Sequence, residues 1–256
     1  MKLLQLLIKI PIFKRLVPSI VRRVLIFLKV YSIRYNFNHI KLILDIRDPI
    51  DRVILFHNHY EKEQLDFLLE KIKENNITHF IDIGANIGIY TLFIKSRIDS
   101  IKVISFEPHH GAFTRLIENI KINNFQLAIT SINKGLSNIK GFMFIEGPKN
   151  LGINQSGGAK LLDKGTNKVE VTTVDKEIHL EGYNIAIKID VEGYENKVIS
   201  GCKELFRNNN ILLQIEIFDS NYKEVNAMLL ALNFIQEKKI ELNHAFDTND
   251  YYYLNY

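Results

Sequence analysis

The sequence predicts an α/β fold built on a doubly wound, mostly parallel sheet that finishes in an antiparallel C-terminal hairpin. Three observations predict this class. Short apolar runs alternate with helical patterns, one run ends in an acid and a glycine loop, and charged residues follow the end of a later run. A chain of 256 residues, 46% of them hydrophobic, is long enough for one such domain to bury a large core.

The elements follow one another regularly along the chain. Apolar residues recur with a helical period from Leu65 to Ile72 and predict a helix over 61–74. Further helices are predicted over 110–122, 195–206 and 222–232, and strands over 80–83, 101–106, 127–132, 141–145, 168–174, 185–189, 211–217, 234–242 and 251–254. Residues 126–174 are strand-like and irregular, so they either recognise a ligand or form a plain insert that extends the sheet.

The glycine loop after the first of these strands indicates a ligand that contains adenosine. Asp82, Gly84, Ala85, Asn86 and Gly88 follow the pattern D-x-G-A-N-x-G between the strand and the next helical pattern. A dinucleotide fingerprint requires G-x-G-x-x-G to seat a pyrophosphate, and here an asparagine occupies the place of the middle glycine. An acid two residues before the first glycine suits an amine better than a phosphate. The loop therefore predicts S-adenosylmethionine, bound by these five residues.

The second strand ends in Glu107 and Pro108, where a doubly wound fold places the acid that binds ribose hydroxyls. An alternative is that Glu107 only caps the helix over 110–122, because acids favour a helix N-terminus and proline favours the first turn. The order of strand, acid and preceding glycine loop favours the ribose role. Ser137, which opens the irregular segment 137–168, completes the candidate residues for the cofactor.

A cluster of charges ends the strand over 185–189. Lys188 and Asp190 alternate with isoleucines, and Glu192 and Glu195 follow. Residues just beyond the carboxyl ends of parallel strands line the ligand crevice, and buried charges are costly unless they are used or paired. In the alternative interpretation the glutamates start a helix and Lys188 pairs with Asp190. That interpretation leaves a lysine and an aspartate on a buried strand without a purpose.

These motifs together resemble the FkbM-type S-adenosylmethionine-dependent methyltransferases. The resemblance rests on residues 80–91, on Phe106-Glu107-Pro108 followed by Asn119 to Asn123, and on K-x-D-x-E-G-x-E over 188–195, and it extends from about Tyr60 to the C-terminus. It implies a class I methyltransferase (Rossmann-like) fold. It also implies methyl transfer to an oxygen, commonly a hydroxyl of a sugar or of a glycosylated or polyketide product.

Methyl transfer to a hydroxyl requires a group that takes the hydroxyl proton. Asp190 is the first candidate for this base, with Glu192 and Glu216 as alternative or supporting carboxylates and Lys188 as the group that orients one of them. The same three acids are also the kind of oxygen ligands that Mg²⁺ takes. No spacing here indicates an octahedral site, so a metal-free network is favoured and no metal ligand is assigned.

The N-terminal residues form a basic amphipathic segment. Residues 1–44 contain nine Lys or Arg and no acid, while the rest of the chain has 24 basic against 29 acidic residues, within a net charge of +4. Charges and prolines interrupt every apolar run, so the segment does not span a bilayer. We expect a helical extension over 1–50 and a methyltransferase domain over 51–256. The extension covers the sheet, contacts a membrane surface or joins a homodimer.

The predicted acceptor is a small molecule or glycan with a free hydroxyl, and the protein is expected to be cytoplasmic or peripheral at a membrane. One alternative function is RNA 2′-O-methylation, but the acidic domain lacks the basic track of a nucleic-acid binder, so no nucleic acid is expected. Another is a noncatalytic adenosine-binding or membrane-associated module. A single cysteine, Cys202, excludes an internal disulfide and is expected to be a small buried residue.

Overall fold

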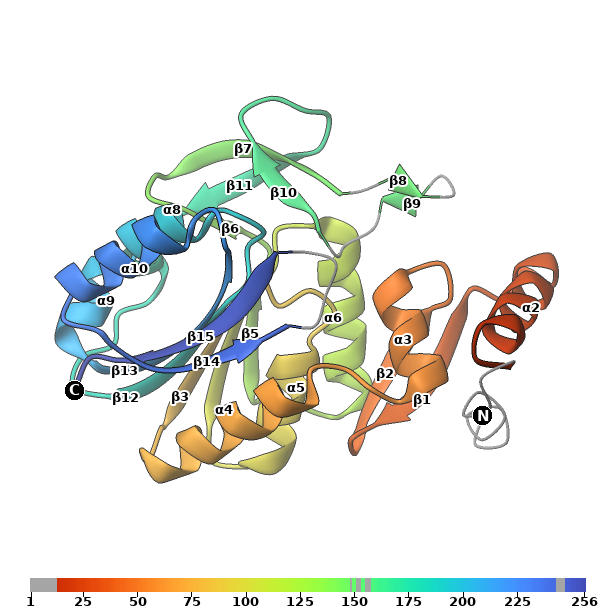
Figure 1. Ribbon diagram of the computed structural model, residues 1–256, viewed down its shortest axis with the longest axis horizontal. Helices are drawn as coiled ribbons and strands as arrows, with labels where there is room; N and C mark the ends of the chain where they lie inside the picture. The colour runs from red at the N-terminus through yellow and green to blue at the C-terminus, as the bar shows by residue number, and fades with distance from the viewer. Residues whose placement is uncertain (1–12, 148, 151–152, 155–157, 243–246) are drawn as a thin grey trace.

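The computed structural model describes residues 13–147, 149–150, 153–154, 158–242 and 247–256. Its centre is a seven-stranded sheet in the order β14-β15-β13-β12-β3-β4-β5 (Figure 1). The strands are β3 (His79–Ile83), β4 (Lys102–Phe106), β5 (Ile129–Ile132), β12 (Asn184–Ile189), β13 (Asn210–Phe218), β14 (Ile235–Glu241) and β15 (Thr248–Leu254). All neighbours pair in parallel except β15, which is antiparallel to both β13 and β14. The predicted fold class, a class I methyltransferase sheet with a C-terminal hairpin, is confirmed.

Helices cover both faces of this sheet. They are α4 (Lys62–Glu74), α5 (Ile89–Arg97), α6 (His110–Ile122), α7 (Val174–Glu177), α8 (Glu195–Ser200), α9 (Lys203–Asn208) and α10 (Tyr222–Ala231). Side chains alternate along each strand, so Phe80 joins the core beneath α4, α5 and α6, whereas Ile81 and Ile83 join the core beneath α8, α9 and α10. The apolar residues of the strands thus fill two cores. The polar residues at the strand ends lie outside these cores and are available to form a functional site.

The helix predicted over 195–206 is divided into α8 and α9 at Gly201 and Cys202. A side chain at Gly201 would lie 2.2 Å from the carbonyl oxygen of Ser137, so this close approach requires glycine. Cys202 is fully buried, as the sequence indicated. The strand predicted over 168–174 ends earlier, at Thr172, because Val174 begins α7.

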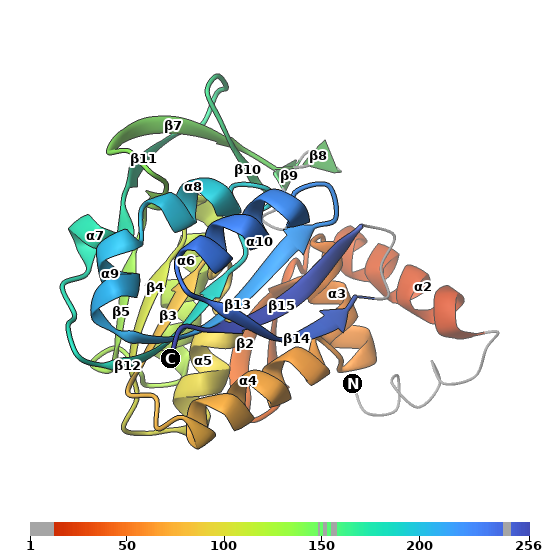
Figure 2. The same cartoon turned by 60° about the vertical axis from the view of Figure 1, so that its left-hand side comes forward.

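Beyond β5, which is the edge strand of the main sheet, the irregular segment forms a second sheet. Strands β6 (Gly135–Leu136), β7 (Gly141–Glu146), β10 (Lys160–Leu162) and β11 (Lys168–Thr172) pair in the order β10-β7-β11-β6. A short pair, β8 (Lys149–Asn150) and β9 (Ile153–Asn154), follows β7. Figures 1 and 2 both show β7, β10 and β11 above the end of the main sheet where β3 and β12 finish. Residues 135–172 therefore do not extend the main sheet.

The N-terminal segment is helical only in part. Helix α2 (Phe13–Phe27) is followed by strands β1 (Ser32–Phe37) and β2 (Ile40–Asp45) and by helix α3 (Pro49–His57), while residues 1–12 of the expected extension lie outside the described residues. The expectation of a helical extension over 1–50 is wrong for residues 32–45. Apolar residues alternate there with a period of two, and Asn38 and His39 adopt the positive φ of a tight hairpin turn.

The hairpin belongs to the same core as one face of the main sheet. Phe37, Ile40, Leu42 and Leu44 are at most 1% exposed and pack in one cluster with Phe80 and the helices on its side of the sheet. Packing therefore continues across residue 50, where the sequence suggested a domain boundary.

Two asparagines of α6 join β2 to the domain. Asn119 accepts from the Ile43 amide at 2.7 Å and donates to the Ile87 carbonyl at 2.9 Å. Asn123 accepts from the Lys41 amide at 2.8 Å and donates to its carbonyl at 2.7 Å. Asn119 and Asn123 are one helical turn apart, and a helical turn is about as long as two residues of a strand. The two asparagines can therefore bind Lys41 and Ile43, which are two residues apart on the edge of β2 that pairs with no other strand. This contact explains why asparagines recur in the motif over 119–123.

We expect Asn119→Ala to lower the free energy of unfolding by about 3 kcal/mol, because it leaves a buried amide and a buried carbonyl without partners. Chemical denaturation would measure this change. Glu118→Ala, one position earlier and exposed, is the control and should change stability by less than about 0.5 kcal/mol. Equal effects of the two substitutions would contradict a structural role for the asparagine.

Candidate functional site

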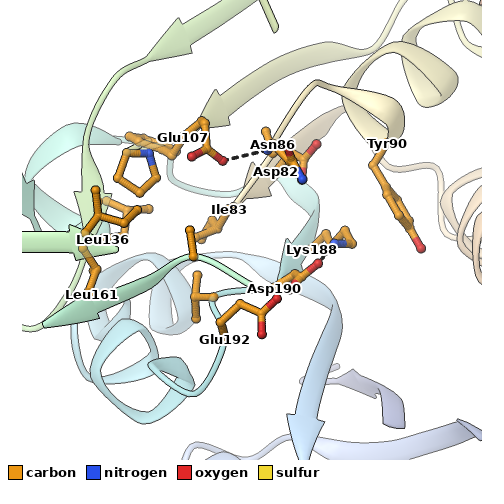
Figure 3. Close-up of a pocket in the computed structure, with 18 of the residues that line it drawn as sticks. Asp82, Ile83, Asn86, Tyr90, Glu107, Leu136, Leu161, Lys188, Asp190 and Glu192 are labelled. Atoms are coloured by element: carbon orange, nitrogen blue, oxygen red, sulfur yellow. Dashed lines mark hydrogen bonds and ion pairs between the residues drawn. The ribbon is translucent and has the colours of Figure 1, made fainter. Parts of the chain in front are cut away.

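A pocket lies at the carboxyl ends of β3, β4 and β12, beneath the second sheet (Figure 3). Its lining combines acids, a glycine loop, two tyrosines and an apolar wall. The lining residues are Ile50, Tyr60, Asp82, Ile83, Gly84, Ala85, Asn86, Ile89, Tyr90, Phe106, Glu107, Pro108, Lys134, Gly135, Leu136, Ile145, Gly158, Ala159, Leu161, Lys188, Asp190, Val191 and Glu192. Nine of the twelve residues predicted from the sequence are among them.

The glycine loop is held close to the neighbouring strand ends. Gly84 has φ +83°, and a Cβ there would lie 1.9 Å from the carbonyl oxygen of Asp190. The amides of Gly84 and Ala85 both donate to the Phe106 carbonyl at 3.0 Å, and Asn86 has φ 50°. The loop thus needs glycine for its conformation and for contact with the end of β12.

Gly84→Ala should lower the free energy of unfolding by about 3 kcal/mol or more, since it adds a steric clash to backbone strain. Gly182→Ala is the matched control. Gly182 has φ +74°, but a Cβ added there would meet nothing within 4 Å, so this variant should show strain alone, about 1 kcal/mol. Denaturant titration of both variants would test the difference, and equal losses would show that contact with Asp190 is unimportant.

Asp82 has one engaged and one free carboxylate oxygen. Oδ2 accepts from the Thr91 amide at 3.0 Å and from its hydroxyl at 2.6 Å. Oδ1 is buried and has no hydrogen-bond partner within the described part of the chain. The residue is 1% exposed, and burial raises its pKa although Lys188 and Thr91 act in the opposite direction. A buried acceptor without a partner at a pocket wall indicates a ligand with a donor.

Glu107 is fixed by the backbone at the end of β4. Its Oε2 accepts from the Asn86 amide at 2.8 Å, and its Oε1 accepts from the His109 amide at 2.7 Å. Figure 3 shows the carboxylate facing the glycine loop. Burial raises the pKa of Glu107 to about 7. Helix α6 is capped by His109, whose Nδ1 accepts from the Ala112 amide, so the alternative of Glu107 as helix cap is wrong.

Lys188 and Asp190 form an ion pair at the end of β12. The Lys188 Nζ lies 2.9 Å from Oδ2 of Asp190 and 4.5 Å from the ring centre of Tyr90. Lys188 is 4% exposed, and four nearby acids raise its pKa against the opposing effect of burial. The Asp190 side chain is 23% exposed and lines the pocket. The Lys188 ammonium therefore holds the Asp190 carboxyl group at the pocket surface.

Glu192 lies in the turn after β12. It has φ 54°, next to Gly193 at φ 98°, and its side chain points into the pocket beneath Leu161 (Figure 3). Burial and the charge of Asp190 raise its pKa to about 7. Glu195 turns away from the pocket and accepts from the Gly193 amide at 2.8 Å, so it shapes the turn.

The structure adds a polar network that the sequence did not reveal. Tyr90 donates to Oε2 of Glu61 at 2.7 Å and accepts from Nε2 of Gln214 at 3.2 Å. Gln214 also donates to Oδ1 of Asp250 at 3.0 Å. Glu61 and Asp250 are among the acids that act on Lys188. The last strand was predicted over 251–254. A prediction that began it at Thr248 would have included Asp250 and placed that residue beside β13.

Three predicted residues do not line the pocket. Gly88 begins α5 at φ +89°, and a Cβ there would lie 2.4 Å from Leu116, so its role is packing. Ser137 is buried behind Leu136 and donates its amide to the Thr172 carbonyl at 2.8 Å. Glu216 pairs with Asp250 across β13 and β15, one strand beyond the pocket.

Glu216 nevertheless belongs to the same group of acids. Burial, followed by the charges of Asp190 and Asp250, raises its pKa to about 9. Burial and the charge of Glu61 raise the pKa of Asp250 to about 7. Repulsion within this group is relieved when one member holds a proton. Across the described ranges, no three His, Cys, Asp or Glu residues are grouped in a way that could hold a metal ion.

Comparison with known proteins gives one family match. The model of the methyltransferase FkbM domain matches residues 82–241. Methyltransferase sdnD of Sordaria araneosa is 30% identical over 115 residues, which are 44% of this chain and 43% of sdnD. The chain thus spans less than half the length of that relative. Hexuronic acid methyltransferase AglP of Haloferax volcanii is 25% identical over 186 residues, 72% of this chain and 70% of AglP.

Solved structures resemble the chain more distantly. TYW2 of M. jannaschii, in complex with AdoMet, has 12% identity and a TM-score of 0.48 over 88% of this chain and 85% of that one. The tRNA (uracil-54, C5)-methyltransferase of Pyrococcus abyssi, in complex with S-adenosyl-L-homocysteine, has 11% identity and a TM-score of 0.48 over 88% of this chain and 44% of that one.

Proposed function

Because the chain belongs to the FkbM methyltransferase family, we propose that it transfers a methyl group from S-adenosylmethionine to a hydroxyl of a sugar, in a glycan or glycoconjugate. Membership of the family makes the chain an S-adenosylmethionine-dependent methyltransferase. What we propose is the acceptor: that the methyl group goes to a hydroxyl, and that this hydroxyl belongs to a sugar. The observation that carries this proposal is the Lys188–Asp190 pair, which holds a carboxyl group beside the glycine loop.

Residues at the ends of β3 and β4 fit the donor. The free Oδ1 of Asp82 suits the ammonium of the methionine part, and the glycine loop beside it lines the same part of the pocket. Glu107 still has lone pairs for two ribose hydroxyls beyond its two backbone partners. Leu136 and Leu161 offer an apolar surface for adenine on the Glu107 side (Figure 3). Bound S-adenosylmethionine supplies an electrophilic methyl group.

Asp190 is proposed as the general base. Its carboxylate accepts the proton of the acceptor hydroxyl while the hydroxyl oxygen forms the new bond to carbon and the carbon–sulfur bond breaks. Lys188 orients this carboxylate through the 2.9 Å ion pair. Glu192, on the same wall, is placed to accept a hydrogen bond from a second hydroxyl of the acceptor.

A sugar acceptor is supported by three features. AglP, whose name states that it acts on hexuronic acid, aligns over 70% of its length. The acceptor side of the pocket presents carboxylates, which pair well with vicinal hydroxyls. The second sheet covers the pocket, with Ile145 in its lining, and its position supports a role in limiting which acceptors enter.

Labelled methyl transfer tests this proposal. Sugars and glycoconjugates with free hydroxyls are incubated with protein and S-adenosylmethionine carrying a labelled methyl group. We expect label on the acceptor that withstands mild alkali, because a methyl ether is stable and a methyl ester is not. Acceptors with acetylated hydroxyls are the control. Label that alkali releases would place the methyl group on a carboxylate and contradict the hydroxyl.

A further inference from the structure

Helix α2 carries apolar side chains on two faces. Val17, Val21 and Leu25 are partly buried and pack against the core that the hairpin shares with the main sheet. This face anchors the helix. Figures 1 and 2 show α2 at the edge of the molecule, beside α3 and far from α9 and α10.

The other face is an apolar stripe open to solvent. It consists of Leu16, Ile20, Val24 and Phe27, which are 51%, 49%, 50% and 85% exposed. Their spacing of four, four and three residues aligns them along one side of the helix. We call these four residues the α2 stripe. Leu28 and Val30, 59% and 41% exposed, continue the apolar surface past the helix end. So many exposed apolar side chains in one place indicate a binding surface.

The charged residues of the segment that carries the α2 stripe are of one sign. Arg23 and Lys29 are exposed on the same segment, and Arg34 follows on β1. No acid occurs before Asp45, whereas the rest of the chain has more acids than bases. An apolar stripe on a segment whose own charged residues are all basic matches a surface that is anionic outside and apolar beneath.

We propose that the α2 stripe docks on an anionic phospholipid membrane, with α2 lying in the plane of the interface. Phe27, Leu16, Ile20 and Val24 enter the boundary of the acyl chains, and the arginines and lysines remain at the headgroups. A second copy of the chain suits the stripe less well, because a two-fold contact would bring basic segments together. No described helix has the length and hydrophobicity needed to cross a membrane.

Sedimentation with vesicles tests the proposal. Full-length protein is mixed with vesicles of phosphatidylcholine alone or with phosphatidylglycerol added, at low and high salt. We expect binding to the anionic vesicles that weakens with salt and little binding to phosphatidylcholine. The double variant Ile20→Ser/Phe27→Ser should bind about tenfold more weakly or worse. Arg23→Gln/Lys29→Gln should also weaken binding, about tenfold.

Matched controls separate docking from loss of folding or of activity. Leu127→Ser changes an equally exposed apolar residue away from α2, and Lys121→Gln removes an exposed charge from α6; both should bind like the wild type. Every variant should keep its melting temperature and its affinity for S-adenosylhomocysteine. Equal binding to both kinds of vesicle, or equal loss in the controls, would overturn the proposal.

Two other ways of covering the α2 stripe would give different experimental results. If a second copy covers the α2 stripe, sedimentation velocity will show a dimer that Ile20→Ser/Phe27→Ser dissociates. If residues 1–12 cover it, the same variant will melt at a lower temperature without vesicles. Either result would overturn membrane docking. A monomer with unchanged melting temperature that binds anionic vesicles supports it.

Discussion

Asp190→Asn is expected to reduce the rate of methyl transfer by about 10³-fold while S-adenosylhomocysteine still binds. The amide has the shape of the carboxylate but cannot take a proton from the acceptor hydroxyl. The backbone of residue 190, which contacts Gly84, is unchanged, so the donor loop should keep its structure. Lys188 retains Glu61, Asp82 and Asp250 as neighbouring acids, and the pocket should therefore remain folded.

Single-turnover rates with a responsive acceptor, alongside calorimetric titration with S-adenosylhomocysteine, would measure both quantities. Asp163→Asn changes an exposed acid of the loop after β10 and should leave rate and affinity unaltered. Lys188→Met tests orientation: it should lower the rate less than Asp190→Asn, because the carboxylate is still present but loses the ion pair that orients it. A rate within tenfold of the wild type for Asp190→Asn would remove Asp190 as the base.

The part of the pocket that we propose for the donor was predictable because it is local in sequence. Asp82, Gly84 and Asn86 lie within one loop, and the positive φ values and close contacts of that loop restrict the residue types strongly. Glu107 was found because the end of a neighbouring parallel strand must lie at the same edge of the sheet. For such residues, strand order and residue type suffice.

The acid network was less predictable because it depends on register between distant segments. Asp250 lies opposite Glu216 only through the antiparallel pairing of β13 and β15. Glu61 reaches the network through Tyr90, from a helix that precedes β3. The hairpin over 32–45 was missed for a different reason: basic residues within the apolar alternation resembled an amphipathic helix, and the tight turn at Asn38 and His39 was not recognised.

The affinity for S-adenosylhomocysteine should fall as the pH drops from about 8 to 6, approaching tenfold per pH unit below pH 7. Burial raises the pKa of Glu107 to about 7 in the donor-free protein, with Asp82 and Asp190 as the facing charges that add to the rise. Ribose hydroxyls donate to a carboxylate, so binding favours the ionised form and is lost as the pH falls through this pKa.

The stability of the folded protein depends on the ionisation of Glu107 in the opposite direction. Between the ordinary glutamate pKa, roughly 4.5, and about 7, folded Glu107 keeps a proton that the unfolded chain has released, so its contribution to stability falls as the pH rises. Protonation of Glu107 at low pH therefore does not destabilise the fold, so weak binding at low pH would not be explained by unfolding caused by this residue. Melting temperatures recorded at each pH would check that the protein stays folded across the titration.

Glu107→Gln should lower the affinity about 100-fold at pH 8 and remove most of the pH dependence, because a neutral amide offers one acceptor oxygen and no charge. Glu195→Gln is the matched control: its carboxyl is also buried with a pKa raised to about 7, but it lies outside the pocket lining. That variant should bind with the wild-type affinity and the wild-type slope. If Glu107→Gln keeps the slope, the titrating group is another acid of the pocket, with Glu192 as the next to replace, and ribose binding by Glu107 is wrong.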